Sequence, residues 1–120
     1  MVVDSSVFLE ILSDGPLRSK CERAIDGKEV VVPTLVLFEI YRKLKSRTTE
    51  DDALSAIAAL RQFRVADLTA ETALLAGDLS LEHSLPMADS FVLAHAMVLG
   101  LKLVTLDNDF NGIDSAIVLR

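Results

Sequence analysis

The chain has 120 residues, with 12 Lys and Arg against 18 Asp and Glu and a formal net charge of −6 at pH 7. A chain of this length is expected to form one domain over residues 1–120. At 51% hydrophobic residues it is too apolar to be disordered, yet no apolar run approaches the ~18 residues of a membrane span. Its single cysteine excludes an internal disulfide and a cysteine-based zinc site.

The composition and the first residues also limit where in the cell the protein is expected and which partners it is expected to bind. The first residues lack the basic segment that begins a secretory signal, so a cytoplasmic protein is expected. Aromatic residues make up 5% of the chain with no Trp, which disfavours a base-stacking platform for nucleic acids. The negative charge disfavours non-specific binding to DNA or RNA unless metal ions hold the acidic side chains.

In the first half of the chain, short apolar runs alternate with segments of helical periodicity. The predicted elements are, in order, a strand at Met1–Val3, helices at Ser5–Leu12 and Leu17–Ile25, a strand at Val30–Val32 and a helix at Thr34–Arg47. Asp14-Gly15-Pro16 separates the first two helices, and Thr34 is the predicted N-cap of the third.

The second half continues the alternation. The predicted elements are a helix capped by Thr48 or Thr49 and running to about Gln62, a strand at Phe63–Ala66, helices at Thr69–His83 and Ala88–Leu99, and strands at Lys102–Thr105 and Ala116–Leu119. Because the strands are short, apolar and separated by helices, the sequence predicts an α/β fold. We expect three α/β/α layers around a central, mostly parallel five-stranded sheet.

Acidic residues recur at places that such a fold brings together. Ligand sites of α/β sheets lie beyond the carboxyl ends of the strands. Asp4 follows the first predicted strand, and Asp107 comes just after Thr105, which ends the fourth. Glu39 lies in the helix after the second strand, and Asp89 opens the helix before the fourth. We therefore expect these side chains at one edge of the sheet.

Two of these acids lie in unusually apolar helices. Glu39 is the only charged residue between Glu29 and Arg42, and Asp89 precedes a nearly uninterrupted apolar run. A carboxylate in such surroundings loses hydration at a cost of several kcal/mol unless something compensates it. A divalent cation is the simplest compensator.

Each acid also has an ordinary structural explanation. Asp4 suits an N-cap, Glu39 a polar stripe with Arg42 and Lys43, Asp89 the first turn of a helix, and Asp107 a turn. For each acid taken alone, the structural explanation is about as good as a role in a shared site. Together they require four acids to reach one sheet edge by chance, which favours a shared site.

Four segments resemble the acidic motifs of PIN domains, above all those of the toxin ribonucleases of VapBC-type toxin–antitoxin pairs. The segments are Val2-Val3-Asp4-Ser5-Ser6, Pro33-Thr34 with Phe38-Glu39, Leu85-Pro86-Met87-Ala88-Asp89, and Leu103-Val104-Thr105-Leu106-Asp107-Asn108-Asp109-Phe110. They occur in order over nearly the whole chain. The most specific are the opening Asp-Ser-Ser and the Thr-x-Asp-x-Asp-Phe run.

The resemblance implies an acidic cluster that binds Mg²⁺ or Mn²⁺ and hydrolyses RNA phosphodiester bonds. Asp4, Glu39, Asp89 and Asp107 would be the catalytic, metal-binding acids, with Ser6 and Thr105 as polar supports. Asp109 competes with Asp107 for the fourth position, and Asp107 is favoured because it is nearer the strand end. By the same resemblance, we expect a homodimer neutralised by a cognate antitoxin that covers the acidic cleft.

A group of basic residues follows Glu39 on the same predicted helix. Its members are Arg42, Lys43, Lys45 and Arg47. Arg42 and Lys43 in particular are candidates for binding RNA phosphates beside the cleft. The alternative is a solvated C-terminal turn whose cations suit the helix dipole, and the two interpretations are compatible.

Two other functional interpretations follow from the same residues. Asp107-x-Asp109-x-Asn111-Gly112 begins like an EF-hand calcium loop, but Val118 stands where the bidentate Glu is required. The stronger alternative is a catalytically inactive PIN-like module that binds RNA or protein. The presence of all four acids counts against such a loss of activity.

Overall fold

A wholly parallel five-stranded sheet organises the computed structural model, which describes residues 1–120. Its strands are β1 (Val2–Val3), β2 (Val31–Pro33), β3 (Arg64–Ala66), β4 (Leu103–Thr105) and β5 (Ala116–Val118). Their order across the sheet is β3-β2-β1-β4-β5, and all four neighbouring pairs are parallel. The predicted fold class is thereby confirmed.

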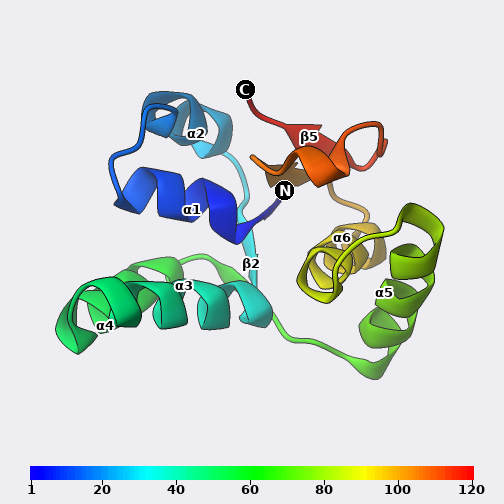
Figure 1. Cartoon of the computed structure of the whole chain (residues 1–120), viewed down its shortest axis with the longest axis horizontal. Helices are drawn as coiled ribbons and strands as arrows, with labels where there is room; N and C mark the ends of the chain where they lie inside the picture. The colour runs from blue at the N-terminus through cyan, green and yellow to red at the C-terminus, as the bar shows by residue number, and fades with distance from the viewer.

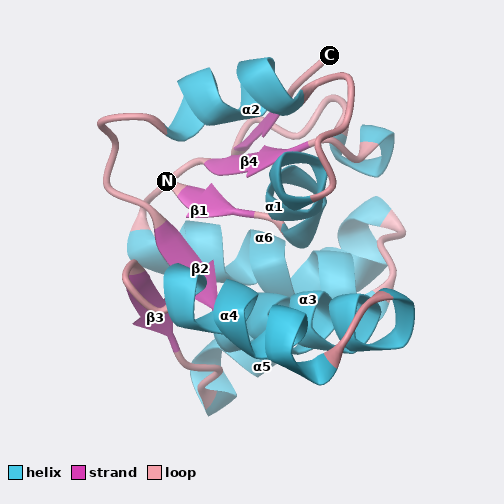
Figure 2. Cartoon of the chain, turned by 90° about the vertical axis from the view of Figure 1, so that its left-hand side faces the viewer, coloured by secondary structure: helices cyan, strands magenta, loops and turns pink.

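Six α-helices and one short 3₁₀ helix connect the strands. They are α1 (Ser5–Leu12), α2 (Arg18–Ile25), α3 (Thr34–Arg47), α4 (Glu50–Leu60), α5 (Ala70–His83), α6 (Met87–Leu99) and η1 (Asn108–Phe110). Figure 1 shows α1 to α4 on one side of the strands and α5 with α6 on the other, which makes the three layers. Figure 2 shows β1, β2 and β4 from a perpendicular direction.

The core explains why the three central strands read as uninterrupted apolar runs. β1, β2 and β4 are buried along their whole length because helices cover both faces of the sheet. Val2, Val31 and Val104 are at most 1% exposed and belong to one cluster of 21 buried apolar residues. β3 is an edge strand, so it tolerates the exposed Arg64.

The strand order reverses between β1 and β4, and this reversal positions the candidate site. The chain lays down β1, β2 and β3 in one direction, then crosses back to place β4 on the free side of β1. A parallel sheet opens a crevice outside the carboxyl ends of its strands at such a switch point. Asp4 directly follows β1, and Asp107 follows β4 by two residues, so both acids lie at this crevice.

Most predicted elements occur within one or two residues of their expected bounds, and three details differ. Thr34 is the first residue of α3 rather than its N-cap, because Pro33 extends β2 and takes the cap position without a side-chain hydrogen bond. Thr49, not Thr48, caps α4 by accepting a hydrogen bond from the Asp52 amide at 3.1 Å. The 3₁₀ helix η1 was not predicted.

The helices are too short to cross a bilayer. The longest, α3 and α5, have 14 residues each, and none combines the length and apolar character that a membrane span requires.

Candidate metal centre at the carboxyl edge of the sheet

Asp4 is a buried N-cap whose carboxylate is fully engaged by neighbouring donors. Its side chain is 6% exposed. Oδ1 accepts a hydrogen bond from the Ser5 amide at 2.8 Å, while Oδ2 accepts from the hydroxyls of Ser6 at 2.9 Å and Thr105 at 2.8 Å. The capping role and the predicted place in an acidic site are therefore combined in one side chain.

The two hydroxyls that hold Asp4 also fix the loop after β4. Ser6 Oγ accepts a hydrogen bond from the Leu106 amide at 3.0 Å, and Thr105 Oγ1 accepts from the Asp107 amide at 3.0 Å. Thr105 is completely buried, so its hydroxyl depends on these partners. Ser6 and Thr105 thus join Asp4 to the loop after β4, and their role as polar supports of a catalytic site stays a prediction.

Asp107 and Asp109 are brought together by the short helix η1. Asp107 Oδ1 accepts a hydrogen bond from the Asp109 amide at 2.8 Å, which begins the 3₁₀ turn. Phe110, fully buried in the core, anchors the other end of that turn. The sequence offered these two acids as competitors, whereas the structure brings both into one cluster with Asp89.

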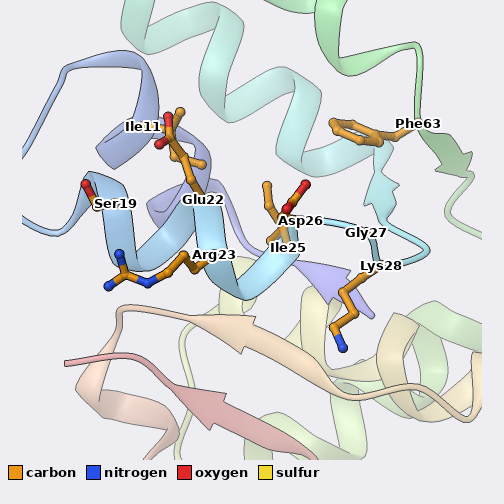
Figure 3. A pocket seen from close by; sticks show the side chains of 9 residues that line it. All are labelled: Ile11, Ser19, Glu22, Arg23, Ile25, Asp26, Gly27, Lys28 and Phe63. Atoms are coloured by element: carbon orange, nitrogen blue, oxygen red, sulfur yellow. The ribbon is translucent and has the colours of Figure 1, made fainter.

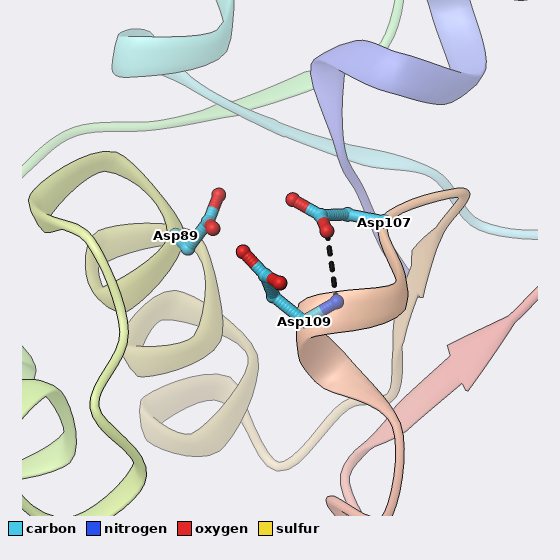
Figure 4. Close-up of side chains that lie close together, drawn as sticks. All are labelled: Asp89, Asp107 and Asp109. Atoms are coloured by element: carbon cyan, nitrogen blue, oxygen red, sulfur yellow. Dashed lines mark hydrogen bonds between the residues drawn. The ribbon is translucent and has the colours of Figure 1, made fainter.

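Asp89 completes this cluster from the other layer. Helix α6 precedes β4, so it begins at the carboxyl edge of the sheet and carries Asp89 there in its first turn. One carboxylate oxygen from each of Asp89, Asp107 and Asp109 lies within 4.8 Å of the other two. Figure 4 shows the three carboxylates facing a common space between α6 and η1.

Glu39 approaches the same edge from α3 and is half-buried. Desolvation raises the pKa of Glu39, and the negative charge of Asp4 raises it further, while the Ser5 hydroxyl and the Lys43 ammonium oppose both effects. Glu39 is not among the three acids within mutual ligand distance. Sequence reasoning missed the part played by Ser5, although the Asp-Ser-Ser motif contains it.

Burial and mutual repulsion disturb the ionisation of the acids. Desolvation raises the pKa of Asp4 in spite of its three hydrogen bonds, with a smaller contribution from the charge of Asp107. The pKa of Asp89 rises to about 7, first by desolvation and then by the charges of Asp107, Asp4, Asp109 and Glu39. The charges of the other four predicted acids therefore all reach Asp89 at this edge.

These residues fit a hard divalent cation. The three clustered side chains offer only carboxylate oxygens, which are the ligands that Mg²⁺ and Mn²⁺ prefer. A bound cation would also offset the burial and the neighbouring negative charges that raise the pKa of Asp89 to about 7. The arrangement thus has both the donor set and the uncompensated charge of a metal centre.

Basic side chains line a cavity that opens beside the acids. The cavity, of about 390 Å³, lies between α1 and α3 and is bordered by Glu39, Arg42, Lys43 and Arg47. The fourth basic residue of this helix, Lys45, instead pairs with Glu50 at 3.2 Å. Three of the four cations thus border the same cavity as Glu39, whereas Lys45 pairs with Glu50.

A wider surface cavity lies away from the acids. It measures about 710 Å³ and is lined by residues of α1, α2, the loop before β2 and Phe63 (Figure 3). These segments precede strands β2 and β3, so the cavity lies toward the amino ends of those strands. None of the five acids borders it. Its width does not make it the candidate site.

The fold and the acidic cluster define a small α/β protein with a candidate divalent-metal centre at the switch point of its sheet. The family model of the PIN domain matches residues 1–116, and the chain belongs to the PIN domain family. No curated protein matches the chain by sequence.

Solved structures show the same fold at low sequence identity. A toxin–antitoxin complex from Klebsiella pneumoniae has a TM-score of 0.82 and 21% identity, over 98% of this chain and 95% of that chain. VapC20 from Mycobacterium tuberculosis, described as a toxin that cleaves the sarcin–ricin loop, gives 0.78 and 22% over 94% of both chains. VapBC2 from Rickettsia felis, bound to a DNA fragment from its promoter, gives 0.77 and 15% over 98% and 96%.

Thr105→Val is expected to destabilise the protein and to misplace the acidic loop. The change removes one of the three hydrogen bonds to the buried Asp4 carboxylate and leaves the Asp107 amide without its Thr105 partner, at a combined cost of about 1–3 kcal/mol. Thr105→Ser keeps the hydroxyl and removes one methyl group, worth about 1 kcal/mol. Urea unfolding measures both variants, and equal stability of the two would contradict the network.

Ionisation of Asp89 is expected to oppose folding when divalent cations are absent. Its pKa is about 7 in the folded chain against 3.8 ordinarily, so the unfolded chain releases the proton first. The stability that protonated Asp89 contributes is complete below about pH 4 and is lost as the pH rises through about 7. Melting temperatures in EDTA should fall over this range for the wild type relative to Asp89→Asn. A constant difference would refute the assignment.

Proposed function

We propose that the protein is a metal-dependent endoribonuclease that hydrolyses RNA phosphodiester bonds, and that it is the toxin of a toxin–antitoxin pair. The observation that carries this proposal is the meeting of Asp89, Asp107 and Asp109 within 4.8 Å at the switch point of the sheet. Membership of the PIN domain family supports nuclease chemistry. The similarity of the fold to toxins and toxin–antitoxin complexes supports the biological role.

The proposed metal ligands are Asp89, Asp107 and Asp109, with Asp4 and Glu39 completing the acidic set. The chemistry that Mg²⁺ or Mn²⁺ supplies when bound is stabilisation of the negative charge that develops on a phosphate during hydrolysis. A bound cation would favour the ionised form of Asp89, because its charge would offset the burial and the neighbouring carboxylates that raise the pKa of Asp89. Asp4, held by three hydrogen bonds, keeps Ser6 and Thr105 in position.

The attacking water needs a base and the scissile phosphate needs a fixed position. In this proposal whichever of Asp107 and Asp109 is not bound to the cation orients the water and accepts its proton. The water oxygen bonds to phosphorus, the bond to the leaving oxygen breaks, and that oxygen takes a proton from solvent. Arg42 and Lys43 bind neighbouring phosphates along the cavity that Glu39 borders. This division of roles reconciles an acidic protein with a polyanionic substrate.

The proposed partners are a cognate antitoxin and a second copy of the chain. An antitoxin that covers the acidic edge with a basic side chain would neutralise the same charge as the cation. The three most exposed large apolar side chains are Leu74, Leu81 and Met87, on α5 and the start of α6. This helix pair is our candidate for the homodimer interface. A cytoplasmic location follows from the proposed substrate.

The alternative is an inactive PIN-like module that binds RNA or protein. Its clearest signature would be the loss of one or more acids, since a binding module has no need to maintain a costly cluster of like charges. All five acids are present, and Asp89 bears that cost as a strongly raised pKa. These observations favour the enzyme.

The proposal predicts RNA cleavage that requires a divalent cation. Calorimetry should detect Mn²⁺ or Mg²⁺ binding to the wild type, and EDTA should abolish cleavage of a structured RNA mixture. Asp89→Asn should bind the cation at least about 10-fold more weakly and lose cleavage, because one of the three close ligands is gone.

A matched control for that variant is Asp51→Asn on α4. Asp51 is an exposed acid outside the cluster, so the same chemical change there should leave cation binding and cleavage intact. Cleavage that persists in EDTA would contradict the metal-dependent mechanism. Absence of both cation binding and cleavage in the wild type would favour the inactive module.

A further inference from the structure

Phe38 is an exposed aromatic ring that borders a cavity together with Glu39, the acid of the candidate site on α3. It lies on α3 directly before Glu39 and is 61% exposed, whereas Val36 and Ile40 on the same helix are completely buried. Burial of an aromatic ring is favourable, so the exposed ring of Phe38 is available to pack against a binding partner. Phe38 borders the same 390 Å³ cavity as Glu39.

Two rows of side chains run from the acids along this face of α3. Residues four apart on a helix lie on the same face, so Phe38 is followed by Arg42 in one row and Glu39 by Lys43 and Arg47 in the next. Ser5 and Leu9 of α1 form the opposite wall of the cavity. The cavity thus combines one aromatic ring, three cations and an acid of the candidate site.

We propose, resting on the proposed nuclease function, that Phe38 stacks on one unpaired nucleobase next to the scissile phosphate and makes cleavage depend on the presence of a base at that nucleotide. A single-stranded RNA presents phosphates and flat apolar bases in alternation. Cations suit the first and an exposed ring suits the second. Because Phe38 adjoins Glu39, the stacked base belongs to a nucleotide close to the bond that is cleaved.

The charge of the cavity favours RNA over a protein segment as the occupant of this ring. Three cations line it against one carboxylate, so the cavity is complementary to a polyanion. The rest of the groove has no second aromatic ring, which limits this dependence to one base position. Recognition of the remaining nucleotides rests on backbone and shape, in keeping with an aromatic content of 5%.

The test combines substitution of the ring with removal of the base. A short RNA that the wild type cleaves at one bond is prepared with each flanking nucleotide replaced in turn by an abasic ribose. At one position the abasic change should lower kcat/KM of the wild type by about 5- to 150-fold, the usual range for one stacked base. Phe38→Leu should lose a similar factor on the intact RNA and lose nothing more on that abasic RNA.

Two variants separate stacking from other effects. Phe38→Tyr retains an aromatic face and should keep most of the wild-type dependence on that base. Leu54→Ala removes a side chain that is 50% exposed on α4 and should leave both kcat/KM values unchanged. The proposal is overturned if abasic positions cost Phe38→Leu the same factor as the wild type. It is also overturned if Phe38→Leu changes the oligomeric state in sedimentation while the abasic penalties persist, because the ring is then a protein contact.

A binding measurement distinguishes failure of this inference from failure of the nuclease function. The probe is a short RNA with the fluorescent base 2-aminopurine at each position in turn, kept intact by EDTA during the measurement, and cleavage is assayed separately with Mn²⁺. At one position its fluorescence should change on binding to the wild type and to Phe38→Tyr, but not to Phe38→Leu. A ring-dependent change without any RNA cleavage would support stacking and reject the nuclease function. Cleavage without a ring-dependent change would reject stacking alone.

Discussion

Repulsion between carboxylates at the switch point of the sheet is the constraint on which the rest of the site depends. β1 and β4 are neighbouring parallel strands, so the acids that follow them are forced to the same edge. Helix α6 adds Asp89 there because it begins where those strands end. Burial removes the water that would screen these charges, and the pKa of Asp89 rises to about 7. A doubly charged cation relieves this strain more fully than protonation does.

The folded state tolerates the buried, mutually repelling carboxylates because well-packed neighbouring residues hold the acids in position. Buried β-branched residues fill the central strands, and Asp4 ties β1 to β4 through the hydroxyls of Ser6 and Thr105. Asp4 is therefore held as a fixed charge, whereas Asp107 and Asp109 lie on a short turn with more exposed carboxylates. Arg42, Lys43 and Arg47 line the cavity that Glu39 borders, and none of them lies within the three-acid cluster. The cluster is therefore free to bind a divalent cation, while the cavity can bind the phosphates of an RNA.

The architecture could be predicted because apolar runs of three residues separated by helical segments have few solutions other than a covered parallel sheet. The exact ends of the elements were harder to predict from the sequence, because they depend on pairing between strands. Pro33 pairs with Ala66 of β3 and so belongs to β2, which makes Thr34 the first residue of α3 and not its N-cap. Helix η1 depends on a local hydrogen bond and on burial of Phe110, neither of which has a periodic signature. For the same reason the sequence could not choose between Asp107 and Asp109. The roles of the five acids stay predictions, although their gathering at one edge follows from the strand order.

The most direct test of the central claim is anomalous diffraction from crystals soaked in Mn²⁺. Our account predicts one or more manganese peaks among the carboxylates of Asp89, Asp107 and Asp109, at distances of about 2 Å from their oxygens. Crystals that diffract well yet show no manganese at this edge, with the acids still close together, would contradict it. The carboxylates would then have to coexist by sharing protons, and the chain would be a PIN domain without a metal centre.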